Sequence, residues 1–228
     1  MSINESLRTA LKKRTIIADG AMGTMIQAAD PSLEDFEGLE GCNEILNVSR
    51  PDIIKEVHRK YLSAGCDAIE TNTFGANFAN LAEYGIPDRI YELAYAGGKI
   101  AKEVTEEFSE KKWVLGSIGP GTKLPTLGHI EFEQLRQTYF QCAKGLVDAG
   151  VDGLLIETAQ DLLQAKAAVI AARSWCCGVP KIFSKSFTPR WGKVEKIPPP
   201  SLLTITRVKF FLFRSKDETS CRKVKSPM

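Results

Sequence analysis

The sequence has 228 residues, of which 43% are hydrophobic and 25% charged, with a net charge of +2. This is the composition of an ordinary soluble globular domain, and the absence of any run of about 18 apolar residues argues against a transmembrane helix. Six cysteines at irregular spacings do not suggest a disulfide framework, and the start MSINESLRTALKKRT lacks the apolar core of a signal peptide, so we predict a cytoplasmic location.

The first 70 residues predict two strands and the helix between them. Residues 15–18 form a short apolar run, as a buried strand does. Pro51 stands where the first turn of a helix favours proline, and apolar residues then recur at helical spacing up to Gly65, a residue suited to ending a helix. Residues 66–69 predict the second strand.

The next hundred residues repeat this alternation. Because each helix must carry the chain back across the sheet, repeated strand–helix units predict parallel strands. Helices are predicted over 87–108, 132–149 and 162–172, and strands over 113–118 and 151–156.

The sequence therefore predicts an α/β fold with about four βα units, the N-terminal half of a (β/α)8 TIM barrel, because a full barrel needs about 250 residues. Two helix-to-strand turns have similar sequences, GCDA at residues 65–68 and GVDG at residues 150–153. Half a barrel leaves sheet edges and an apolar interior without partners, so we expect the chain alone to be marginally stable, to aggregate or to pair with a second half.

The composition changes abruptly near Ser174. Residues 175–228 hold 12 Lys and Arg against 3 Asp and Glu, whereas residues 1–174 hold 18 against 25, and six of the eleven prolines lie in 175–228. We predict a barrel domain over 1–174 and a divergent, basic, proline-rich tail over 175–228 that is non-native or disordered, for example after a frameshift. Residues 180–184 are a candidate fifth strand, and a nucleic-acid or membrane contact through the tail is the less favoured alternative.

Polar residues gather where the predicted strands end. Asp19 follows the first strand, Glu70 the second, residues 119–123 the third and Glu157 the fourth. The carboxyl ends of parallel barrel strands form the active-site face, so three acids there can converge on a ligand ammonium group. The alternative for each single acid is a helix cap or a turn.

Three motifs, DGAMGT at 19–24, ETNTFGAN at 70–77 and LIET at 155–158, resemble those of the homocysteine-binding (homocysteine S-methyltransferase) domain family. Two more, GCNEILN at 41–47 and GSIGPGTKLPT at 116–126, are most similar to the bacterial, actinobacterial-type cobalamin-dependent methionine synthase class of that family. The resemblance covers about residues 7–174. It implies a (β/α)8 barrel that transfers a methyl group to the sulfur of homocysteine in methionine biosynthesis.

The resemblance also implies the substrate-binding residues. Glu157 would pair with the ammonium group of homocysteine, and Asp19 with the backbone of the next two residues would border the substrate. Three further residues would line the floor of the pocket. The full set is Asp19, Gly20, Ala21, Glu70, Asn72, Thr73 and Glu157.

The family activates the substrate thiol with Zn²⁺ held by three cysteines, which follow the sixth and eighth strands. The predicted units stop before those strands, so we expect the isolated chain to lack zinc and to be inactive. Cys176 and Cys177 are adjacent but follow the fourth helix, and we disfavour them as ligands. Cys42, Cys66 and Cys142 are weaker candidates still, and Cys142 is typical of a helix core.

Both histidines have structural interpretations that we prefer. His58 lies within the first long helix and is interpreted as a surface or packing residue, and His129 as a loop residue that could lie near the pocket. In the cobalamin class, cobalamin and methyltetrahydrofolate bind through downstream folate and cobalamin domains. A non-catalytic half barrel that binds an amino acid or a protein partner is the alternative function.

Overall fold

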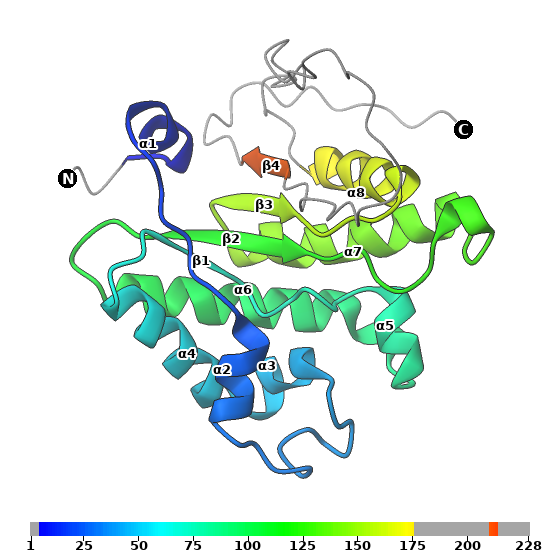
Figure 1. The fold of residues 1–228 in the computed structure, drawn as a ribbon, viewed down its shortest axis with the longest axis horizontal. Helices are drawn as coiled ribbons and strands as arrows, with labels where there is room; N and C mark the ends of the chain where they lie inside the picture. The colour runs from blue at the N-terminus through cyan, green and yellow to red at the C-terminus, as the bar shows by residue number, and fades with distance from the viewer. Residues whose placement is uncertain (1–4, 176–209, 214–228) are drawn as a thin grey trace, which may run out of the picture.

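The protein is a mixed α/β fold built on a parallel sheet (Figure 1). The computed structural model describes residues 5–175 and the backbone of residues 210–213. The sheet order is β1-β2-β3-β4, in which the first three strands are parallel and β4 pairs antiparallel with β3. The strands are β1 (Ala68–Glu70), β2 (Trp113–Ile118), β3 (Gly153–Ile156) and β4 (Phe210–Phe213).

The predicted long helices are confirmed. The helix predicted between Pro51 and Gly65 and those predicted over 132–149 and 162–172 have α-helical counterparts, and the stretch predicted over 87–108 begins with a 3-10 turn before its α-helix. Shorter helices that periodicity did not predict lie before and between them. The helices are α1 (Leu7–Lys13), α2 (Met22–Ala28), α3 (Leu46–Ser49), α4 (Pro51–Ser63), α5 (Phe78–Glu83), α6 (Ile90–Glu106), α7 (Phe132–Ala149) and α8 (Leu162–Trp175), with 3-10 turns η1 (Asn43–Ile45), η2 (Pro87–Arg89) and η3 (Pro125–Leu127).

The strand predicted over 15–18 is reduced to a single parallel bridge between Ala18 and Ala68. The N–H of Ile17 is donated to a carboxylate oxygen of Asp67 at 2.9 Å, where an extended ladder would use a backbone carbonyl. The side chain of Ile17 is 61% exposed, so this position adds little apolar burial. At the other end of the bridge, the N–H of Glu70, the next donor of a parallel ladder, is donated to the carboxylate of Asp19 and not to a backbone carbonyl, so the pairing stays short.

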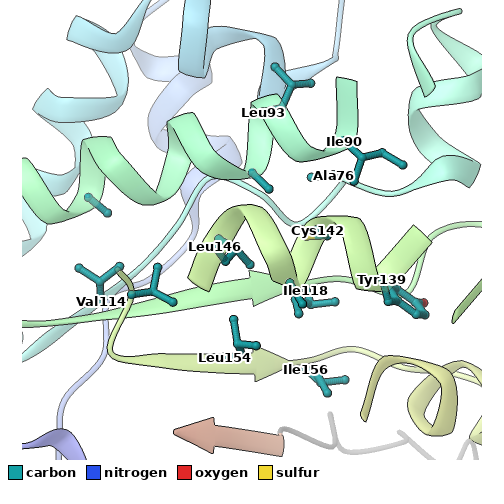
Figure 2. Packing of buried hydrophobic residues seen from close by; sticks show 14 of the residues in the cluster. Ala76, Ile90, Leu93, Val114, Ile118, Tyr139, Cys142, Leu146, Leu154 and Ile156 are labelled. Atoms are coloured by element: carbon teal, nitrogen blue, oxygen red, sulfur yellow. The ribbon is translucent and has the colours of Figure 1, made fainter. Parts of the chain in front are cut away.

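Two separate cores lie on the two faces of the sheet. Alternate strand residues, including Val114, Ile118 and Leu154, pack in the large core beneath helices α6 and α7 (Figure 2). The intervening residues Trp113 and Leu155 belong to a small core on the opposite face. Helix α1 supplies Leu7 and Ala10 to that small core, so it covers the face that would be the interior of a barrel. Period-two alternation along the strands sorts the residues between the two cores.

The two similar turns predicted at residues 65–68 and 150–153 have the same structure. Asp67 donates its N–H to Ile17 O, and its carboxylate accepts the N–H of Ile17. Asp152 donates its N–H to Val114 O, and its carboxylate accepts the N–H of Val114 at 3.0 Å. Each carboxylate also pairs with a cation, Arg14 and Lys102 respectively. Each aspartate therefore ties the start of its strand to the preceding strand at the end of the sheet remote from Glu157.

The predicted tail lies largely outside the described residues. This applies to the candidate strand at 180–184 and to Cys176 and Cys177. Among the described residues, no helix combines the length and the apolar character needed to span a lipid bilayer.

Candidate functional site

The carboxyl ends of the strands bring together the acids that the sequence singles out. Asp19 directly follows the bridge residue Ala18, and its two carboxylate oxygens accept the N–H of Glu70 at 3.0 and 3.1 Å. Glu70 is the last residue of β1, and Glu157 directly follows β3. The parallel order of these segments places the three acids at the same edge of the sheet, and their convergence on one ligand stays a prediction.

Gly20 and Ala21 form the turn between Asp19 and helix α2. The hydroxyl of Tyr61, from helix α4, donates to Ala21 O at 3.1 Å. A Cβ atom at position 20 would lie 3.1 Å from that hydroxyl oxygen, so a side chain larger than hydrogen would crowd Tyr61. The turn is thus held close to α4 and leaves the backbone of Ala21 near the edge where the acids lie.

Glu157 is a buried carboxylate, 7% exposed, whose position is set by a neighbouring strand. The hydroxyl of Ser117, on β2, donates to Glu157 Oε1 at 2.7 Å. The following residue, Thr158, has a backbone φ of 56°. A β-branched residue rarely adopts this left-handed conformation, and such strain is concentrated at functional sites.

Two threonine side chains continue the sheet where β1 has ended. Thr71 Oγ1 accepts the N–H of Ser117 at 3.0 Å, and the hydroxyl of Thr73 donates to Ser117 O at 2.7 Å. The two threonine oxygens are 2.6 Å apart. Because the hydroxyl hydrogen of Thr73 is used in the hydrogen bond to Ser117 O, Thr71 is the donor in the hydrogen bond between the two threonine hydroxyls. Both backbone groups of Ser117 on the β1 side are therefore held by side chains.

Asn72, predicted to line the pocket floor, is turned toward the helical side of the loop. Its Nδ2 donates to Asn43 O at 2.7 Å and to Asn47 Oδ1 at 3.0 Å. Asn47 in return donates to Asn72 O and Leu93 O. Asn72 and Thr73 both have their polar groups engaged in bracing the loop after β1.

Sequence reasoning did not single out Glu44, which the structure places against the same loop. Glu44 Oε1 accepts the N–H of Gly75 at 2.6 Å, and burial raises the pKa of the Glu44 carboxyl. A Cβ atom at position 75 would lie 2.7 Å from Glu44 Oε1. In the sequence, the only trace of this contact is that both of its residues belong to motifs, Glu44 to GCNEILN and Gly75 to ETNTFGAN.

The described cysteines do not fit a zinc site. Cys42, Cys66 and Cys142 are buried and unpaired, and the described part of the chain holds no cluster of three His, Cys, Asp or Glu side chains suited to a metal. Burial raises the pKa of Cys42 and of Cys66 to about 11 and that of Cys142 to about 12. These thiols are therefore protonated near neutral pH, whereas zinc binds thiolates.

The two histidines are not arranged as a pair of metal ligands. His58 is fully buried in α4, which confirms a packing position, and neither of its ring nitrogens has a hydrogen-bond partner among the described residues. His129 is exposed, and its Nδ1 accepts the N–H of Leu124 at 3.4 Å.

Comparison with known proteins gives a family and close relatives. A family model described as homocysteine S-methyltransferase matches residues 16–196. The chain is 55% identical to methionine synthase of Mycobacterium tuberculosis and 52% identical to that of Mycobacterium leprae, each over 170 residues. These matches cover 73% of this chain but only 14% of either relative, so the chain spans about one seventh of their length.

Solved structures share the fold. The homocysteine methyltransferase MmuM from Escherichia coli in its metallated form superposes with a TM-score of 0.60 at 24% identity, over 74% of this chain and 62% of that one. Its oxidized form gives a TM-score of 0.59 over 75% and 62%. The sheet and helices described above are thus part of a TIM-barrel-like arrangement, as the alternating strand–helix pattern predicts.

Proposed function

The chain belongs to the homocysteine S-methyltransferase family, and we propose that its strand ends bind the amino acid part of homocysteine. The observation that carries this proposal is the buried carboxylate of Glu157, held by Ser117 at the edge that also bears Asp19 and Glu70. A carboxylate makes charge-assisted hydrogen bonds to an ammonium group, and homocysteine carries one at its amino acid end.

In this proposal the residues divide into two groups. Glu157 binds the ammonium group, while Asp19 and the backbone of Gly20 and Ala21 border the substrate. Glu70, Asn72 and Thr73 shape the floor, with Asn72 and Thr73 acting through the bracing bonds described above.

The wider activity is proposed from the family. We propose that the intact domain transfers a methyl group to the homocysteine sulfur, as in the methionine synthases that the chain resembles. Zinc would activate the thiol there, and cobalamin and methyltetrahydrofolate would bind to other domains of the full protein. Because the described cysteines do not fit a zinc site, no step through zinc is assigned to them.

We further propose that the barrel part ends near residue 174 and that residues 175–228 are a divergent segment. The support is the change in charge and proline content at this point. The family match extends beyond it, to residue 196. A cytoplasmic location is proposed from the cysteines, because the three in the described residues are unpaired.

Glu157→Gln is expected to weaken the binding of L-homocysteine to the 228-residue chain by about tenfold or more. The substitution keeps the shape of the side chain but removes the charge that pairs with the ammonium group, and charge-assisted hydrogen bonds contribute about 1.5–3 kcal/mol. Isothermal titration calorimetry measures the change. Glu56→Gln is the matched control, since Glu56 lies in α4 with its side chain 55% exposed. Equal affinities for Glu157→Gln and wild type would contradict the proposal.

The purified 228-residue chain is expected to contain no tightly bound zinc and to transfer no methyl group to homocysteine. Three thiolate ligands are needed, and the three described cysteines are buried thiols with raised pKa values. Metal analysis after purification in zinc-supplemented medium, followed by a methyl-transfer assay, checks this. Stoichiometric zinc that survives dialysis would refute it, and a Cys176→Ser, Cys177→Ser variant would then show whether that pair holds the metal.

A further inference from the structure

We propose that Ser117 is a positioning residue, which fixes the direction in which Glu157 presents its carboxylate to the ammonium group of the ligand. The proposal rests on the proposed function of Glu157 and goes beyond it, because it assigns a role to a residue that does not itself pair with the ligand's charge. Ser117 is 2% exposed, and its hydroxyl donates to Glu157 Oε1 at 2.7 Å.

The first support is the way in which the backbone of Ser117 is held. A strand at the edge of its pairing region can shift or fray, because its N–H and C=O groups lose their ladder partners. Here Thr71 accepts the N–H of Ser117 and Thr73 donates to its carbonyl, so neither group is left free on the β1 side. On the other side, Ser117 is in register with Leu155 of β3.

The second support is burial of the whole unit. Thr73 is fully buried, and Thr71 and Ser117 are 3% and 2% exposed. In such surroundings a hydroxyl proton has few alternative acceptors, so the direction of each hydrogen bond is determined. The chain of donors runs from Thr71 to Thr73 and on to Ser117 O, while the hydroxyl of Ser117 points to Glu157.

The third support is the backbone beyond Glu157. Thr158 adopts a left-handed conformation directly after the carboxylate, at a cost of about 1–3 kcal/mol that the surrounding structure must offset. The strained turn fixes where the side chain of Glu157 starts, and Ser117 fixes where one carboxylate oxygen lies. Together they orient the carboxylate before any ligand arrives, which lowers the cost of ordering the site on binding.

The experiment compares two ligands and uses the whole 228-residue chain. L-homocysteine carries the ammonium group, and 4-mercaptobutanoate lacks it. Ser117→Ala should weaken homocysteine binding by about fivefold to tenfold, within the range for the net value of one ordinary hydrogen bond, and change 4-mercaptobutanoate binding by less than about twofold. In a Glu157→Gln background the same substitution should have no further effect on homocysteine.

Two further variants serve as a control for Ser117→Ala and as a substitute for it. Thr105→Val removes another buried hydroxyl, which donates to Lys102 O within α6, and should leave both affinities unchanged. Ser117→Cys keeps the size of the side chain but has only a weak donor, so it should reproduce the selective loss even if Ser117→Ala unfolds.

The possible results separate the two proposals. Equal loss of both ligands in Ser117→Ala, or losses that simply add to those of Glu157→Gln, would show a general structural role and overturn the positioning role. If Glu157→Gln weakens homocysteine and neither Ser117 variant does, only the positioning role fails. If Glu157→Gln has no effect, or if the wild-type chain binds no homocysteine, the proposed function fails and this inference with it.

Discussion

Acidification from pH 6.5 to pH 4 is expected to lower the free energy of unfolding by about 3 kcal/mol through His58 alone, at ~1.4 kcal/mol for each pKa unit. Burial lowers the pKa of His58 from 6.5 to about 4 in the folded protein. In the unfolded chain the imidazole has its ordinary pKa, so below pH 6.5 the unfolded state binds a proton that the folded state does not. The contribution is constant above pH 6.5, is lost as the pH falls, and levels off below about pH 4.

Urea denaturation at a series of pH values measures this effect, and the two histidines of the chain provide their own control. His58→Leu should flatten the loss between pH 6.5 and 4, because leucine fills a similar volume and cannot be protonated. His129→Leu should leave the pH dependence as in the wild type, because His129 is exposed. If His58→Leu keeps the full pH dependence, the loss comes from other groups and the assignment to His58 is wrong.

The parts of the fold that could be predicted are those with a complete local signal. Helix α7 matches its predicted range because its apolar face is continuous and Gly150, with φ of 90°, ends it. Strand β2 matches because all six of its residues are buried, as in a central parallel strand. In both cases the pattern along the chain and the tertiary contacts agree.

Other elements depend on distant residues and could not be predicted. Helix α1 shows only two buried residues, Leu7 and Ala10, and its place is determined by Trp113 and the small core on the inner face of the sheet. The strand predicted over 15–18 was too long because the side chain of Asp19 takes the N–H of Glu70, which would otherwise continue the ladder. A single apolar run cannot reveal such a competitor.

The charged residues of the site could be predicted from the sequence, but the residues that hold them in place could not. Acids directly after strands are visible in the sequence, so Asp19, Glu70 and Glu157 could be named. The role of Ser117 depends on register, because only the pairing of β2 with β3 and the two threonine hydroxyls brings its side chain to Glu157. Hydroxyl residues are common in loops, and nothing in their spacing distinguishes one that hydrogen-bonds to a neighbouring strand from one on the surface.

Gly145→Ala is expected to lower the free energy of unfolding by about 2 kcal/mol, although alanine is the better helix former by ~1 kcal/mol. Gly145 lies in α7 where it crosses α6, and a Cβ atom there would lie 2.6 Å from Tyr91 O and 2.9 Å from Tyr95 N. Both atoms belong to the α6 backbone, so a rotamer change cannot relieve the contact and the helices must separate. The overpacking term therefore exceeds the gain in helix propensity.

Gly23→Ala is the control, because Gly23 also belongs to a helix, as the second residue of α2, but has free space beside it. The nearest atom to a Cβ there is Asn43 Nδ2 at 3.8 Å, an ordinary van der Waals distance. This substitution should raise the free energy of unfolding by about 0.5–1 kcal/mol, since only the propensity term and the entropy of the unfolded chain change. Urea denaturation of both variants gives the two values. A stabilising Gly145→Ala would mean that α6 and α7 are not packed as closely as their glycines indicate.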